Sequence, residues 1–127
     1  MNNTERFINN ESFYAERHYG DDELVLSLKG HPEYNIHIWV GFISDILRKL
    51  KDSDDYWAGF TRDWNEIDRT FCGDPVEMED IDEYINDLLL YKDDTFMFED
   101  TDEAYALILD FLRFAKENNQ TVMADIW

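Results

Sequence analysis

The fold depends on the conformation of residues 36–50, IHIWVGFISDILRKL. Apolar side chains recur there at the 3.6-residue period of an amphipathic helix, at Ile36, Trp39, Val40, Ile43, Ile46, Leu47 and Leu50. Pro32 lies where the first helical residue is expected, a position that tolerates proline. The alternation in residues 36–40 also fits a short strand. Because the helical period continues over the whole stretch, the sequence favours a helix.

Three segments further along the chain show the same period. The first runs from Trp57 to Phe71. The second opens at Asp74-Pro75-Val76-Glu77, which resembles a capping box with proline at the first helical position, and has an apolar stripe from Ile81 to Leu88. The last begins at Asp100 or Thr101 and ends near Asn118 and Asn119. Its inward-facing residues are expected to be Ala104, Ile108, Phe111, Leu112 and Ala115.

The remaining segments are less regular. Residues 4–18 could form a helix, and residues 24–28 could form either a strand or a helical turn. Residues 96–98 and 121–127 could pair as two short strands. The sequence therefore predicts a mainly α fold, with residues 1–127 as a single domain. The expected architecture is a compact bundle of about four to six helices with a small two-stranded β element. A mixed α+β fold is the alternative.

Composition indicates a folded protein of the cytoplasm. The hydrophobic fraction is 44% and the aromatic fraction 16%, which is too high for a disordered acidic tail. The single cysteine, Cys72, excludes an intramolecular disulfide and fits a reducing compartment. We find neither a signal peptide nor an apolar run long enough to span a membrane. A net charge of −19 should repel both nucleic-acid phosphates and anionic membranes.

The acidic charge is concentrated in residues 74–103. This segment has thirteen acidic side chains and one basic side chain, Lys92, so thirty residues carry a formal charge of −12. Self-repulsion at this density destabilises a compact domain. Helix N-termini account for some of these acids, because the helix dipole stabilises negative charge there. A basic partner would account for the rest.

Motifs for catalysis or metal binding are weak. Asp52-Ser53-Asp54 and Asp80-Ile81-Asp82 begin like calcium-binding loops but lack the required glycine. The possible zinc ligands are not spaced as in zinc sites; they are His18, His31, His37 and Cys72. No serine lies in a nucleophile-elbow motif, and Cys72 fits a buried position at a helix end. We therefore expect no enzymatic activity, no metal and no cofactor.

A partner-binding face is the main expectation for function. The residues assigned to it are the acids that helix N-termini do not explain, together with one nearby aromatic: Asp80, Glu83, Asp87, Asp93, Asp94 and Tyr91. Phe96 and Trp127 are further aromatic candidates because they fall outside the helical stripes. Such aromatic residues anchor protein interfaces.

The overall profile resembles bacterial toxin immunity proteins of the contact-dependent growth inhibition and colicin types. The chain is short, acidic, cysteine-poor and rich in Asn, Asp and Ile. Segments such as Gly30-His-Pro-Glu-Tyr-Asn and Trp64-Asn-Glu-Ile-Asp-Arg-Thr-Phe add to the resemblance. It implies a cytoplasmic monomer in a one-to-one complex with the basic C-terminal domain of a cognate toxin, often a nuclease. Inhibition would be by electrostatic and steric blockade.

Two other classes of function stay open. A DNA mimic, such as an anti-restriction protein, would carry acidic residues along an elongated surface, whereas the dense block at 74–103 favours one compact patch. A small enzyme or ligand-binding domain would instead have a pocket with converging polar groups.

Overall fold

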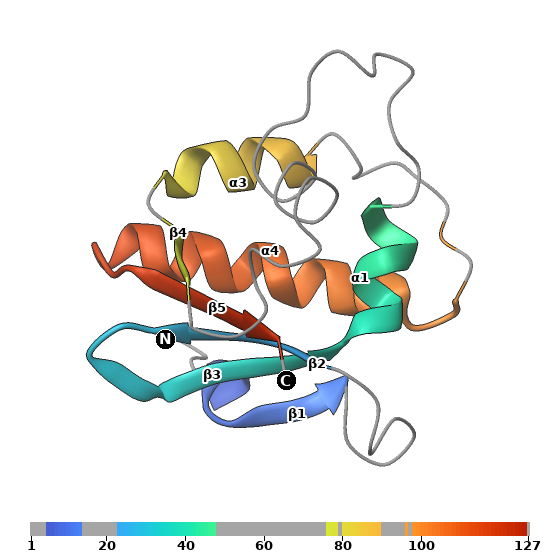
Figure 1. Cartoon of the computed structure of the whole chain (residues 1–127), viewed down its shortest axis with the longest axis horizontal. Helices are drawn as coiled ribbons and strands as arrows, with labels where there is room; N and C mark the ends of the chain where they lie inside the picture. Colours follow the sequence, from blue (N-terminus) through green and yellow to red (C-terminus); the bar gives the residue numbers. More distant parts are fainter. Residues whose placement is uncertain are drawn as a thin grey trace.

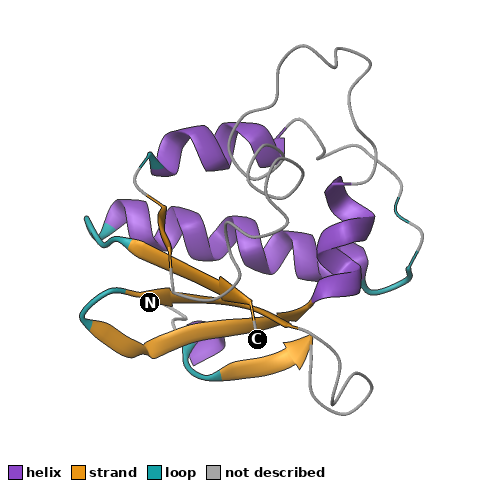
Figure 2. Ribbon diagram, viewed as in Figure 1, coloured by secondary structure: helices purple, strands orange, loops and turns teal. Residues whose placement is uncertain are grey.

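The protein is an α+β fold in which the three α-helices of the described part pack on one face of a five-stranded mixed sheet (Figures 1 and 2). The computed structural model describes residues 5–13, 23–47, 76–78, 80–89, 96 and 98–126. The expectation of a mainly helical bundle is therefore wrong, and its α+β alternative is correct. The predicted helix at Trp57–Phe71 lies outside the described residues.

The sheet joins strands from both ends of the chain in the order β1-β3-β2-β5-β4. The strands are β1 (Asn10–Phe13), β2 (Glu23–Leu28), β3 (His31–Trp39), β4 (Val76–Met78) and β5 (Val122–Ile126). β1 runs parallel to β3, and the other neighbours are antiparallel. A short 3-10 helix, η1 (Glu5–Phe7), precedes β1, so residues 5–13 do not form the helix expected there.

The predicted helix at residues 36–50 is a strand followed directly by a helix. β3 ends at Trp39 and α1 (Val40–Leu47) begins at the next residue. Ile36 and Ile38 pair with Leu26 and Leu24 of β2 and are 0% exposed. Residues 36–39 form a strand because their alternating β-branched residues can be buried on one face of the sheet.

The turn from β3 into α1 requires a glycine. A Cβ added to Gly41 would overlap the six-membered ring of the Trp39 indole. That ring also contacts Phe42, with ring centroids 5.2 Å apart. Gly41 therefore lets the indole lie across the first turn of the helix.

The helices after residue 80 follow the sequence prediction more closely. α3 (Ile81–Leu89) buries Tyr84, Ile85 and Leu88, but it starts later than expected, because Val76–Met78 forms β4. α4 (Thr101–Glu117) buries all five residues predicted to face inward. It ends at Asn118, and Asn119 follows with a φ of 54°, a left-handed conformation common after helices.

One continuous core lies between the helices and the sheet. The leucines of β2, at positions 24, 26 and 28, are 0–3% exposed. They share a face with Ile36, Ile38, Val122 and Ala124, because paired residues of adjacent strands point the same way. Phe111 and Leu112 of α4 are 0% exposed and belong to the same cluster. The opposite face of the sheet has no described helix (Figure 2).

The role of Gly41 can be tested by replacing it with alanine. An exposed helical Gly→Ala change normally stabilises by about 1 kcal/mol. Here we expect Gly41→Ala to lower the free energy of unfolding by about 1–3 kcal/mol, because the new methyl group displaces the Trp39 ring. Urea unfolding followed by circular dichroism measures this change. Asn86→Ala, at an exposed position of α3, is the control and should be neutral or stabilising. A Gly41→Ala protein as stable as this control would contradict the prediction.

Candidate partner-binding surface

The described acids of residues 74–103 fall mainly into two sets. The α3 set comprises Asp80, Asp82 and Glu83, at the start of α3. The α4 set comprises Glu99, Asp102 and Glu103, at the start of α4. Glu77 lies apart from both, on β4, where it pairs with Lys29.

The two sets lie at opposite ends of a helical layer, because α3 and α4 run antiparallel (Figure 1). Asp82, at the start of α3, pairs with Lys116, at the end of α4. The Tyr105 hydroxyl, near the start of α4, donates to the Leu88 carbonyl, near the end of α3. Glu103 and Lys116 lie about 20 Å apart along α4, at about 1.5 Å per residue. The described acids therefore do not form one patch.

The residues assigned from sequence have different environments. Asp80 precedes α3, and its Oδ1 accepts a hydrogen bond of 3.3 Å from the Glu83 amide. Asp80 thus caps the helix and stabilises it, so a helix N-terminus does explain this acid, contrary to the expectation. Glu83 is half-buried in the first turn. Asp87 is only 5% exposed, so its carboxylate is not on the surface assigned to it. Tyr91, Asp93 and Asp94 lie outside the described residues.

An exposed aromatic side chain lies next to the α4 set. Phe98 is 43% exposed, and Ile8 is the other exposed large apolar residue of the described part. The Phe98 ring lies against Trp39, with centroids 5.3 Å apart, and against Phe42, at 6.2 Å. We call Trp39, Phe98, Glu99, Asp102 and Glu103 the Phe98 surface.

A buried carboxylate holds this surface in place. Asp45 of α1 is 2% exposed. Its Oδ2 accepts hydrogen bonds from the Phe98 amide at 2.9 Å and from the Thr101 hydroxyl at 2.7 Å. Hydrogen bonds to a charged acceptor are stronger than neutral ones. Asp45 therefore fixes the backbone on both sides of Glu99 and joins the start of α4 to α1.

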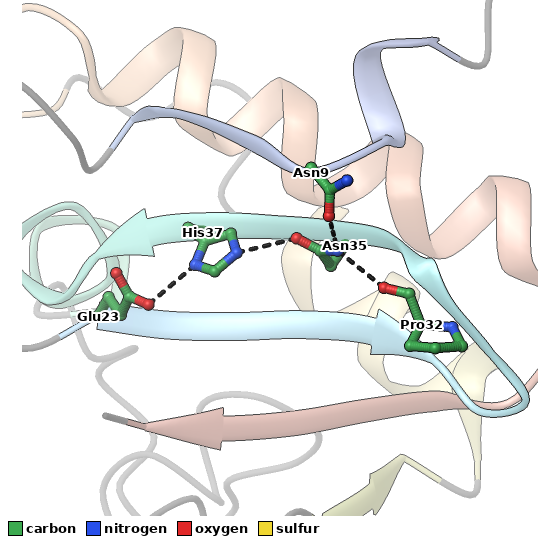
Figure 3. A network of polar contacts seen from close by, with 5 residues as sticks. All are labelled: Asn9, Glu23, Pro32, Asn35 and His37. Carbon is green, nitrogen blue, oxygen red and sulfur yellow. Dashed lines mark hydrogen bonds and ion pairs between the residues drawn. The ribbon is translucent and has the colours of Figure 1, made fainter.

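A second polar cluster lies on the sheet face away from the helices (Figure 3). His37 Nδ1 is 2.8 Å from Glu23 Oε1, and His37 Nε2 is 2.8 Å from Asn35 Oδ1. The Asn35 amide nitrogen donates to Asn9 Oδ1 at 2.7 Å and to the Pro32 carbonyl at 2.8 Å. The cluster links β2, β3 and the segment before β1.

The contacts of this cluster hold strands together, since each nitrogen of His37 contacts an oxygen of a neighbouring side chain. Asn35 also spans an irregularity in the pairing of β2 with β3, between Ser27 and Leu28. At that point β3 has more residues than β2, and the hydrogen bond from Asn35 to the Pro32 carbonyl spans these extra residues.

Metal and membrane sites are not found in the described part of the chain. No three of its His, Cys, Asp or Glu residues are grouped to hold a metal ion. His18, Cys72 and Asp52–Asp54 lie outside it. None of the described helices has the length and hydropathy needed to cross a bilayer.

Sequence reasoning misses Phe98 and Asp45. Its aromatic candidates are Tyr91, Phe96 and Trp127. Tyr91 and Trp127 lie outside the described residues, and Phe96 is partly buried, with its ring centroid 5.7 Å from that of Tyr105. The two phenylalanines are two residues apart and both precede α4, so no periodicity separates them. Asp45 does carry a signal, as the lone acid between Ile43 and Ile46, both of which are buried.

Comparisons of the chain with protein-family models, with curated proteins and with solved structures gave no significant match.

The structural role of the polar cluster can be tested with Asn35→Asp. The substitution keeps the shape but turns a carboxylate oxygen toward Asn9 Oδ1 and the Pro32 carbonyl. We expect the free energy of unfolding to fall by about 1–3 kcal/mol, because buried acceptors lose their donor. Asn86→Asp, an exposed change of the same chemistry, should stay within about 0.5 kcal/mol of the native protein. Equal effects of the two changes in urea unfolding would show that the cluster does not stabilise the sheet.

Proposed function

We propose that this chain is an immunity-type protein that binds a basic toxin domain of the nuclease class and neutralises it without catalysing a reaction. The observation that carries the proposal is the Phe98 surface, an exposed aromatic residue whose backbone amide is bonded to the buried Asp45 and which is followed by three exposed acidic residues. Protein interfaces with slow dissociation combine a central aromatic anchor with charged groups around it.

The net charge of −19 supports a basic partner. Complementary charge accelerates association, and like charge rejects other acidic molecules. A nuclease concentrates Lys and Arg where it holds phosphates, so a protein that offers carboxylates can occupy the same groove. Blockade of this kind needs no bond to form or break. The cytoplasm of the producing cell would be the place of action.

The distribution of acids favours a protein partner over DNA mimicry. A duplex mimic needs a continuous row of negative charge along its surface. The exposed residues of α4 include Arg113 and, in its last turn, Lys116, and these two bases interrupt such a row. Asp110 on the same helix pairs with Arg6.

The proposal is tested by expressing the chain together with the product of the gene immediately upstream. We expect a one-to-one complex with a basic domain whose nuclease activity is lost in the complex and returns on dissociation. Raising the salt concentration from about 0.05 to 0.5 M should slow association sharply and change dissociation little.

An unrelated basic protein such as a histone is the control, and it should bind only weakly and with fast dissociation. Recovery of a DNA-binding enzyme that duplex DNA displaces would support the mimic class instead. If the upstream product does not bind, or keeps its full activity when bound, the proposal is wrong.

A further inference from the structure

We infer that the Phe98 surface is the water-excluding centre of the partner interface and that it accepts an arginine side chain of the toxin domain. In this arrangement the guanidinium stacks on the Phe98 ring, supported by Trp39, and pairs with carboxylates of the α4 set. The inference rests on the proposed function and specifies which end of the molecule meets the partner.

The first argument is the exposure of Phe98 at a rigid position. Trp39 and Phe42 contact its ring, yet 43% of the residue remains exposed. The Phe98 amide is bonded to the buried Asp45 carboxylate, and its carbonyl accepts from the Thr101 amide at 3.2 Å. An anchor whose backbone is already fixed loses little conformational entropy on binding.

The second argument is the charge around the ring. Glu99, Asp102 and Glu103 are exposed and form no ion pair with another described residue. Together they exceed the roughly half positive charge of a helix N-terminus. Residues 98–103 hold four acids and no base. Ile8, the other exposed apolar residue, lies beside the base Arg6 as well as the acids Glu5 and Glu33.

The third argument concerns the chemistry of the occupant. A guanidinium can lie flat on an aromatic ring and still donate hydrogen bonds in its plane to carboxylates. A lysine ammonium is compact and strongly hydrated, so it fits the two roles less well. An exposed aromatic ring just before the acidic first turn of α4 therefore favours arginine over lysine.

The α3 set has a different role in this arrangement. Asp82 already pairs with Lys116, and Asp80 caps its own helix. These acids lie about 20 Å from Glu103, as judged by the length of α4. At that distance they contribute to the long-range field that steers the partner, and to contact only weakly.

The test measures association and dissociation rates of variants with the upstream toxin domain. We expect Phe98→Ala to raise the dissociation rate about 10- to 100-fold and to leave the association rate nearly unchanged. Ile8→Ala is the matched control, because it truncates the other exposed apolar side chain, and it should change neither rate by more than about twofold. Urea unfolding of both variants checks that they are folded.

Phe98→Leu separates arginine stacking from simple apolar contact. Leucine keeps apolar area but has no ring, so dissociation should be about fivefold faster than for the native protein, whereas Phe98→Tyr should stay close to native. If leucine and phenylalanine behave alike, the stacking arrangement is wrong.

Charge variants assign the two acidic sets. The triple change Glu99→Gln, Asp102→Asn and Glu103→Gln should raise the dissociation rate and also lower the association rate. The triple change Asp80→Asn, Asp82→Asn and Glu83→Gln should only slow association. Replacing the exposed acids Glu5, Glu33 and Glu117 with glutamine is the control for the change in net charge.

The outcomes separate the two proposals. If the native protein does not bind the toxin domain, the proposed function fails. If it binds and Phe98→Ala behaves like Ile8→Ala, the proposed function stands and this inference is overturned.

Discussion

The structure depends on strand β2, which is hydrogen-bonded to β3 on one edge and β5 on the other. Its three leucines form the central row of the core. The pairing fixes which residues of β3 and β5 face the helices, because a shift of one residue would turn every side chain to the other face. α1 and α4 then pack on a surface whose pattern is already set. The Phe98 surface follows from that packing, since Asp45 of α1 binds the start of α4.

The sequence predicts the helices after residue 80 well and fails at β3. In α4 every local signal predicts the helix that forms: the apolar residues, the acids of the first turn and the asparagines at the end. Local and tertiary preferences therefore coincide. At residues 36–50 they conflict. Because β3 enters α1 without a connecting loop, two strand positions and the helix positions combine into one false 3.6-residue period. Gly41 permits this junction, but within that period it looks like one more residue of a continuous helix.

The acidic segment, residues 74–103, shows which features of a surface can be predicted from a count of charges and which cannot. The sequence correctly shows that negative charge is concentrated in residues 74–103. It does not show that Asp87 is buried, that Asp80 is a helix cap or that the start of α3 lies far from the start of α4. Those facts depend on how two antiparallel helices meet, which is a tertiary property. Asp45 illustrates the opposite case, because a lone acid on an apolar helix face indicates a buried hydrogen-bonding role from the sequence alone.

The position of β5 has a consequence for how the protein is made. β5 lies between β2 and β4, and Leu24 pairs with Ile126, so the sheet is completed by contacts between distant parts of the chain. Such non-local pairing folds slowly, since a long loop must close before the contact stabilises the structure. During synthesis one edge of β2 and the paired edge of β4 lack their partner until β5 has been made. Loss of β5 would therefore separate β4 from the sheet as well as leave one edge of β2 unpaired.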